Sequence, residues 1–345
     1  MSKSQKSITD IAFDFAFDSV KNTMKQKTKL DSLFKTLTAK GWIPGKAVGW
    51  NEEQTKRSYA ILCNAQMKAD NLPLACVATE LLAKHQPDTV RGVMYSVVSA
   101  GWLPDTSHKS YSRIQRLLNI LRKRGVIPFD WIVDNIRSTI KPSSWSGLGS
   151  FADTVAEAYR KDFWAELPEY IEIIVEKDTV AGRIASVTRE FDVRLHPLRG
   201  YASTSFAHQI GSAWKEIKKP ITVYYVGDHD PSGRDIERSV IACLKEYSGK
   251  SFNWVRLGVT PEQFEQFNMI ALEPKKKDKR YKEFVDRYGP KCAEVEAIPA
   301  SELRDMVRTA IERHIPPEQW ARLQEVERTE KRQWSQVMEN MKGAA

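Results

Sequence analysis

The feature that most constrains this fold is a regular alternation of short β-branched runs with helix-like segments in the second half of the chain. The clearest strand-like runs are 170–175 (YIEIIV), 221–226 (ITVYYV) and 252–257 (FNWVRL), and a weaker strand is expected at 194–198. The segments between them have apolar residues at helical spacing. Strands that alternate with helices form parallel sheets, because each helix returns the chain to the same end of the sheet. The sequence therefore predicts an α/β fold with a parallel sheet.

The first half of the chain is expected to be helical. Helices are predicted over 8–40, 51–69, 89–100 and 107–124, and the turn GWLPD joins the last two. Two helices joined by a short turn resemble a helix-turn-helix or winged-helix unit. A Ser- and Gly-rich linker, PSSWSGLGS at 142–150, is expected to separate this half from the sheet. The predicted organisation is a helical N-terminal region (1–85), a winged-helix (CAP-like) domain (86–142), an α/β domain (143–315) and a C-terminal helix (316–345).

Positive charge is concentrated on the second helix of that pair. The chain of 345 residues has a formal net charge of +9, and residues 106–141 contain eight Lys and Arg against two Asp. Apolar residues every three or four positions from Ile114 to Leu121 mark one buried face of this helix. The opposite face is basic, which suits double-stranded DNA but also an ordinary solvated surface. The candidate DNA-binding residues are Lys109, Arg113, Arg116, Arg122, Lys123 and Arg124.

Composition narrows the class of protein. The chain is 41% hydrophobic and 28% charged, which is typical of a folded domain rather than a disordered one. No apolar run reaches the roughly 20 residues that a membrane helix needs, and acidic residues interrupt the apolar positions near the N-terminus, unlike in a signal peptide. The four cysteines are far apart, so neither a disulfide framework nor a zinc cluster is expected. These features predict a cytoplasmic protein with no membrane partner, associated with the nucleoid if its polyanion is DNA.

Acidic side chains directly follow two of the predicted strands. Glu176 comes after YIEIIV, and Asp228 and Asp230 come after ITVYYVG. The carboxyl ends of parallel strands meet at one edge of a sheet, where ligands of α/β proteins bind. Three carboxylates at that edge would suit Mg²⁺, which prefers hard oxygen ligands and also binds substrate phosphate. A structural alternative exists, since Asp230 before Pro231 and Asp178 in VEKD are suitable helix caps.

The phrases that carry these residues resemble a known family. VEKD (175–178), RGY (199–201) and DHDPSGRDI (228–236) are similar, in this order, to the Toprim domain of the topoisomerase VI A-subunit family. That family includes meiotic double-strand-break transesterases and compact orphan proteins of mobile elements, the Mini-A type. RLGVTPEQ and KKKDKRYKEFVDRYG continue the similarity, which covers roughly residues 88–314. The resemblance implies that Glu176, Asp228 and Asp230 bind Mg²⁺.

The same family places a nucleophilic tyrosine upstream, in an Arg-x-x-x-Tyr phrase. The sequence RGVMY, from Arg91 to Tyr95, is similar to it. The apolar stripe of this helix runs from Val90 to Val98 at other positions, so we expect Tyr95 to lie on a different face, outside the core. Arg91 precedes it by one turn, where a guanidinium would hold a scissile phosphate or favour phenolate. A surface tyrosine without chemistry is the alternative.

The resemblance implies a function. The protein would cleave double-stranded DNA by Mg²⁺-dependent tyrosine transesterification and leave a 5′-phosphotyrosyl link, like the A subunit of a type IIB topoisomerase. It would act as a homodimer, with a GHKL-type ATPase B subunit in trans as a further partner, since no ATPase motif is visible in this chain. Two alternatives stay open, a Toprim-type nuclease that hydrolyses DNA with water and a DNA-binding partner subunit without catalysis.

Two parts of the chain depart from the family pattern. His229 inside DHD departs from the family's phrase, and residues 1–85 do not match the family pattern. Lys177, Arg199 and Lys275–Lys277 are candidate phosphate contacts, with ordinary surface charge as the alternative.

Overall fold

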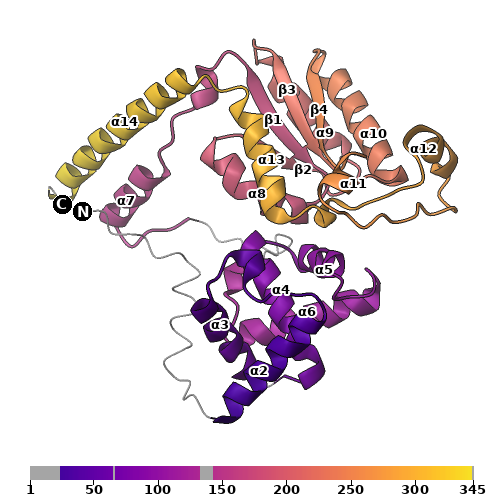
Figure 1. The fold of residues 1–345 in the computed structure, drawn as a ribbon. Coiled ribbons are helices and arrows are strands. Elements are labelled where there is room, and N and C mark those ends of the chain that lie inside the picture. Colours follow the sequence, from indigo (N-terminus) through magenta and orange to yellow (C-terminus); the bar gives the residue numbers. More distant parts are fainter. Residues whose placement is uncertain (1–23, 65–66, 133–142, 344–345) are drawn as a thin grey trace.

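A four-stranded parallel sheet organises the second half of the chain (Figure 1). The computed structural model describes residues 24–64, 67–132 and 143–343. The strands lie in the order β2-β1-β3-β4, and all neighbouring pairs are parallel. The predicted α/β fold is confirmed, as a helical N-terminal region followed by a parallel sheet with interleaved helices. The strands are β1 (Tyr170–Val175), β2 (Arg194–Pro197), β3 (Ile221–Val226) and β4 (Asn253–Gly258).

Helices cover both faces of this sheet. In β1, Ile171 and Ile173 pack in the apolar cluster that contains α8 and α13, whereas Ile174 packs in the cluster that contains α9 and α10. A strand that is buried on both faces has a continuous apolar run instead of an alternating one, which explains the signals YIEIIV and ITVYYV. The covering helices are α8 (Asp178–Glu190), α13 (Ala300–Glu312), α9 (Thr204–Lys215) and α10 (Pro231–Ser248).

The N-terminal half is a group of helices that includes an almost fully buried one, α4. In residues 24–64 and 67–132 the structure has no strand longer than an isolated bridge. The predicted pair of helices is confirmed as α5 and α6, with Ser107 capping α6 and Gly125 following it in a left-handed conformation. The helical elements are α2 (Met24–Ala39), η1 (Lys46–Val48), α3 (Glu52–Asn64), η2 (Ala69–Asn71), α4 (Leu72–His85), α5 (Val90–Ser99), α6 (His108–Lys123) and η3 (Phe129–Trp131).

Three helix boundaries differ from the expectation. The helix predicted over 51–69 is α3, which ends at Asn64, and Pro73 lies in the first turn of the next helix, α4. Proline fits that turn because its missing N–H is one that a helix start leaves unbonded anyway. The predicted linker is shorter than expected, since α7 (Leu148–Ala158) begins inside it. Of the first predicted helix, residues 8–23 lie outside the described part of the chain.

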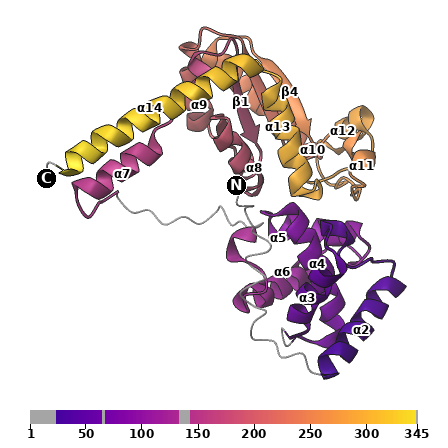
Figure 2. The same ribbon diagram turned by 60° about the vertical axis from the view of Figure 1, so that its left-hand side comes forward.

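The longest helix, α14 (Pro317–Gly343), lies beside α7, and together they extend away from the sheet (Figures 1 and 2). The Tyr159 hydroxyl donates to Glu330 at 2.6 Å across this pair. Nowhere in the described residues is there a helix both long and apolar enough to cross a membrane. The remaining elements are η4 (Phe163–Ala165), α11 (Gln263–Gln266), α12 (Tyr281–Tyr288) and η5 (Val295–Ala297).

A buried polar contact joins the two halves. The guanidinium of Arg183 on α8 lies 2.8 Å from the carboxylate of Asp88, and both side chains are buried. Arg304 on α13 donates to three successive carbonyls at the end of α4, those of His85, Gln86 and Pro87, at 2.7, 2.7 and 3.0 Å. The last carbonyls of a helix have no partner within the helix, so Arg304 satisfies them from the other half. Apolar residues of both halves also belong to one continuous core cluster.

We expect Arg304→Leu to lower the free energy of unfolding by about 2–4 kcal/mol, because three partly buried carbonyls lose a charged donor. The matched control is Arg308→Leu, one turn further along α13, where the guanidinium pairs with Glu190 at the surface. That change should cost less than about 1 kcal/mol. Urea denaturation of both variants measures the difference, and equal losses would show that Arg304 does not join the halves.

We call the contacts of Asp88 with Arg183 and of Arg304 with the end of α4 the joint. The joint should also weaken in acid. Burial, with Lys84, Arg183 and Arg304 nearby, lowers the pKa of His85 from 6.5 to about 4. A group with a depressed pKa contributes stability that is full above the unfolded pKa and is lost as the pH falls toward the folded one. Between pH 6.5 and 4, the free energy of unfolding of the parent protein should therefore fall by on the order of 2–3 kcal/mol because of His85. The variant His85→Gln should not show this fall.

The control for this acid effect is His208→Gln, because His208 is exposed on α9. Thermal melts at several pH values compare the three proteins. An unchanged acid profile in His85→Gln would contradict the assignment of this acid lability to the joint.

Candidate functional site

The acidic residues predicted from the sequence lie at the switch point of the sheet. From β1 the chain moves to β2 on one side and then to β3 on the other side, so the crevice lies beyond the ends of β1 and β3. Ligands of open α/β sheets bind at such a point. Glu176 follows β1, and Asp228 follows β3 after one glycine. The strand order thus brings the two acidic loops together at one edge of the sheet.

Backbone groups hold these carboxylates. The Asp228 N–H donates to Glu176 Oε2 at 2.8 Å, and the Val295 N–H donates to Asp228 Oδ1 at 2.9 Å. Asp230 Oδ1 accepts from the Gly233 N–H at 2.6 Å and so caps α10, as its structural alternative predicted. A Cβ at Gly233 would lie 2.5 Å from the Asp228 carbonyl oxygen, so only glycine lets α10 start this close to the acidic loops.

A lysine neutralises the edge. Lys177 Nζ lies 2.7 Å from Asp228 Oδ2, 3.2 Å from Glu296 Oε2 and 3.7 Å from Glu294 Oε2. We call these four residues the lysine cluster. Lys177 was a candidate phosphate contact, but in this structure its ammonium is bound by carboxylates of its own chain.

Burial and charge act against each other in the lysine cluster. Burial raises the pKa of Asp228 to about 7, although Lys177 lowers it, and burial likewise raises the pKa of Glu176. Burial alone would also raise the pKa of Glu296, but Lys177 and Arg183 hold it below its ordinary value. Burial would lower the pKa of Lys177, and the three carboxylates instead raise it. The lysine is therefore firmly protonated, and its positive charge stabilises the edge.

Two of these carboxylates were not found from the sequence. Glu294 and Glu296 follow the DHD loop by more than sixty residues, and they reach it because the backbone of His229 pairs with that of Ala293 at 2.9 and 3.1 Å. The alternation of acidic and apolar residues in CAEVEAIP was the available signal, but a short alternation does not show which strand end it meets.

The candidate nucleophile lies beside this cluster in the same chain. Arg91 Nη1 donates to both oxygens of Glu294 at 2.8 and 2.9 Å. Burial and the charge of Glu294 raise the pKa of Tyr95, while Arg91 and Lys177 lower it. The structure thus brings Arg91, Tyr95 and the acidic loops together within one chain.

The expectation that Tyr95 lies outside the core is wrong. Its side chain is only 2% exposed and belongs to the core cluster. The face of α5 that carries it is covered by the other half, through contacts of α5 with η5. A periodicity within one helix identifies the face that its own domain buries but not a face that a second domain covers. Arg91 and Ser99 on the same side remain exposed.

Position 92, between Arg91 and Val93, requires glycine for a steric reason. A Cβ there would lie 2.2 Å from the Asp88 carboxylate. Any side chain at this position would therefore push against the buried pair of Asp88 and Arg183 that joins the halves. The glycine in RGVMY is explained by the joint, whatever the tyrosine does.

The other predicted residues are not part of the lysine cluster, although Arg199 lies at the same edge, where the N–H of the next residue, Gly200, donates to the Glu176 carbonyl at 3.1 Å. Arg199 is 72% exposed and pairs with Asp178 at 2.7 Å. On α6, Arg113 donates to Asn71 and Arg122 lies over the ring of Phe129, both within the helical half. The exposed basic residues of α6 and of its C-cap are Lys109, Arg113, Arg116, Lys123 and Arg124, and Arg122 is partly buried.

His229 points away from the acidic groups. Its ring packs edge-on against Phe264, Phe284 and Tyr288, and its Nδ1 lies 2.9 Å from Arg234 Nη2. Burial lowers the pKa of His229 to about 4. It is therefore a neutral, packed residue, and its place inside DHD is structural.

The residues do not form a ready metal centre as they stand. Their carboxylate oxygens are of the right chemistry for Mg²⁺. In the described part of the chain, however, no group of three or more His, Cys, Asp and Glu side chains is placed to hold an ion. Both oxygens of Asp228 are engaged, one by the Val295 N–H and the other by Lys177. Binding of a cation to Asp228 would require Lys177 to move.

Comparisons with known proteins do not add to this picture. No family model and no curated protein matches the chain. The chemistry of the edge is therefore inferred from its residues and their geometry.

We expect Lys177→Met to destabilise the protein by about 2–4 kcal/mol at pH 8, since it leaves buried carboxylates without their cation. Burial raises the pKa of Asp228 to about 7 even beside Lys177, so this penalty grows as the pH rises and Asp228 ionises, and it shrinks as Asp228 is protonated toward pH 5. The control is Lys161→Met, whose ammonium lies 3.2 Å from Glu166 near the surface. Urea denaturation at both pH values measures the effect, and a pH-independent loss would contradict the electrostatic role.

Proposed function

We propose that this protein is a DNA transesterase of the topoisomerase VI A type, in which Tyr95 attacks a backbone phosphodiester. The observation that carries the proposal is the place of Tyr95 beside Arg91 and the lysine cluster, at the switch point of a parallel sheet. The finer assignments belong to the same proposal, namely a Toprim domain for the sheet and a winged-helix (CAP-like) domain for α5 and α6.

The proposed step needs only a rearrangement of bonds. The phenol oxygen of Tyr95 bonds to phosphorus, the bond from phosphorus to the neighbouring O3′ breaks, and the phenol proton ends on O3′. One phosphorus–oxygen ester bond replaces another, so the phosphotyrosyl link retains the bond energy that religation needs. An unperturbed phenol has a pKa near 10, so at neutral pH it needs a nearby cation or base. Arg91 provides the cation and Glu294 a carboxylate.

Burial of Tyr95 sets a condition on this step. A phenol that is 2% exposed cannot reach a phosphodiester, so α5 must separate from η5 before attack. Separation would also release Arg91 from Glu294 and free its guanidinium for phosphate. In this proposal the structure is a closed form, and DNA would bind the open one.

The partners are inferred on the same basis. Exposed basic side chains of α6 suit the backbone of double-stranded DNA. Cleavage of both strands needs two tyrosines and therefore two copies of the chain. Large exposed apolar side chains on α7 and α14, including Leu148 and Val337, offer a surface for such a homodimer. An ATPase B subunit of the GHKL type, a mobile-element context and a nucleoid location in the cytoplasm remain expectations from the resemblance.

Mg²⁺ bound by Glu176, Asp228 and Asp230 is part of the proposal. Such an ion would stabilise negative charge on the phosphate. Supporting it are the carboxylate chemistry of the edge and the raised pKa values of Glu176 and Asp228, because burial disfavours their negative charge and a cation would relieve that penalty. In the closed form, Lys177 opposes binding of Mg²⁺, because its ammonium already occupies Asp228 Oδ2.

The second candidate is a Toprim-type nuclease that hydrolyses DNA with water. The burial of Tyr95 favours it, because water would need no exposed phenol. A DNA-binding subunit without catalysis is the third.

A cleavage assay separates these functions. The protein is incubated with supercoiled plasmid and Mg²⁺ and then denatured with detergent, with and without protease. We expect linear DNA that stays attached to protein, loss of the adduct when EDTA replaces Mg²⁺, and loss of the adduct in Tyr95→Phe. Tyr111→Phe is the matched control, because Tyr111 lies under Arg91 on α6 but outside the lysine cluster.

Three results would contradict the proposal in different ways. Free ends that persist in Tyr95→Phe would establish hydrolysis. Retained binding without cleavage would establish a binding subunit. An adduct lost equally in Tyr111→Phe would show that the loss reflects the fold around α5 and not the phenol.

A further inference from the structure

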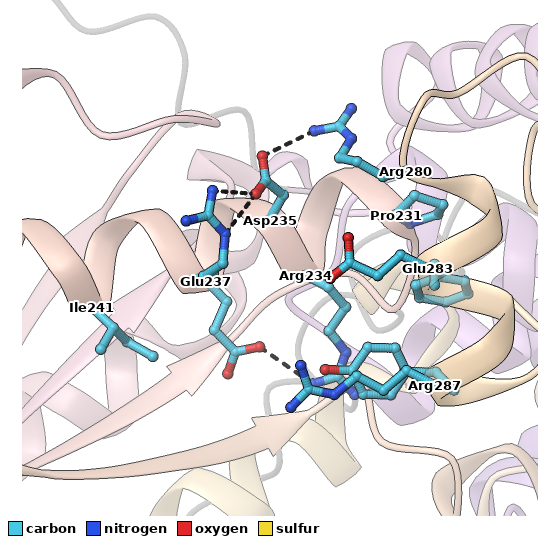
Figure 3. Close-up of a pocket in the computed structure, with 11 residues that line it drawn as sticks. Pro231, Arg234, Asp235, Glu237, Ile241, Arg280, Glu283 and Arg287 are labelled. Carbon is cyan, nitrogen blue, oxygen red and sulfur yellow. Dashed lines mark hydrogen bonds and ion pairs between the residues drawn. The ribbon is translucent and has the colours of Figure 1, made fainter.

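A cleft between α10 and α12 is not used by the proposed function. It has a volume of about 350 Å³, within the range of ligand pockets. Side chains from the two helices face each other across it, as Figure 3 shows. We call it the arginine cleft, because four arginines line it: Arg234, Arg238, Arg280 and Arg287.

The carboxylates of the cleft are largely occupied by residues around them. Asp235 accepts from Arg238 at 2.7 Å, from the Tyr201 hydroxyl at 2.5 Å, and lies 3.3 Å from Arg280. Glu237 pairs with Arg256 from β4 as well as with Arg234. The third carboxylate, Glu283, stands opposite them on α12.

Two arginines are left with donors toward solvent. Arg238 is 73% exposed, and its contacts to Asp235 use Nε and Nη2. Arg287 is exposed and lies over the Tyr288 ring at 5.2 Å, and in the described part of the chain it pairs with no carboxylate. Ile241 and Phe284 give the cleft an apolar portion. Planar guanidiniums with free N–H groups match the oxygens of a phosphate.

The surface outside the cleft is also basic. Residues 275–287 contain seven Lys and Arg against three Asp and Glu. Lys275, Lys276 and Lys277 are exposed, and a neighbouring hollow is lined by three basic and two acidic residues, Lys279, Lys282 and Arg287 with Glu283 and Asp286. A ligand with one phosphate would fill the cleft, whereas a strand with repeated phosphates would also follow this surface.

The cleft adjoins the acidic edge. Pro231 lines it and directly follows Asp230, and Arg234 contacts His229 inside the DHD loop. Arg234 also lies 4.4 Å from the centroid of the Tyr288 ring, which fixes α12 against this loop. The cleft thus adjoins the loop that carries Asp228 and Asp230.

We propose that the arginine cleft binds a phosphate of a nucleic-acid strand, with Arg238 and Arg287 as the contacting residues and 275–287 as the surface that the strand follows. A free nucleotide offers the same phosphate chemistry without the strand. The inference concerns binding alone, so it is independent of cleavage by Tyr95. It places a second contact with DNA on the α/β half, in addition to the basic face of α6.

The test uses the full chain in EDTA, where no Mg²⁺-dependent cleavage takes place. Arg238→Ala with Arg287→Ala is compared with the parent protein by fluorescence anisotropy, using a short labelled DNA duplex, a labelled single strand and labelled ATP. We expect affinity for DNA to fall at least about tenfold. The slope of log affinity against log salt should be reduced by about 1.8 on the duplex, or about 1.4 on the single strand, for two lost phosphate contacts. Thermal melts verify that the double variant is folded.

The matched control is Arg328→Ala with Arg332→Ala on α14, two exposed arginines that pair with Glu325. This variant has the same change in net charge and should bind all three probes like the parent protein. Equal loss in both variants, or no loss for any probe in the cleft variant, would overturn the proposal. If the cleft variant lost affinity for ATP alone, the cleft would still be a phosphate site, but its ligand would be a free nucleotide and not a nucleic-acid strand.

Discussion

The buried pair of Asp88 and Arg183, together with Arg304, is the interaction on which the rest of the structure depends. It closes the end of α4, excludes a side chain at position 92 and holds α5 against η5. An unpaired charge at this depth would be costly, so the two halves are stable together in one arrangement. Tyr95, Arg91 and Glu294 lie close to one another as a consequence of that arrangement.

The sequence was informative where one element determines its own pattern. ITVYYV and YIEIIV are strands at the predicted bounds, because a strand buried on both faces needs a continuous apolar run. Glu176 and Asp228 meet because parallel strands end at the same edge. Burial of Tyr95 and the approach of Glu294 depend on contacts between distant segments. Such contacts have no local periodicity, and they could not be predicted from the sequence.

Charge is separated over a short distance around the start of α10. On one side the carboxylates of the lysine cluster gather around a single ammonium, and on the other side guanidiniums outnumber carboxylates. His229, neutral and enclosed by aromatic rings, lies between the two. Because His229 is uncharged, it offsets the charge of neither region. The net charge of +9 does not reveal this arrangement.

The enclosed position of Tyr95 has a kinetic consequence. A group that reacts only when two halves separate has an apparent rate equal to its intrinsic rate multiplied by the fraction of molecules that are open. Each 1.4 kcal/mol of additional contact energy at the joint lowers that fraction about tenfold. Substitutions far from the phenol, in α4 or α13, would thus change the reactivity of Tyr95 without altering its surroundings in the open form. In the proposed transesterase, stability at the joint and reaction rate at the tyrosine are therefore opposed quantities.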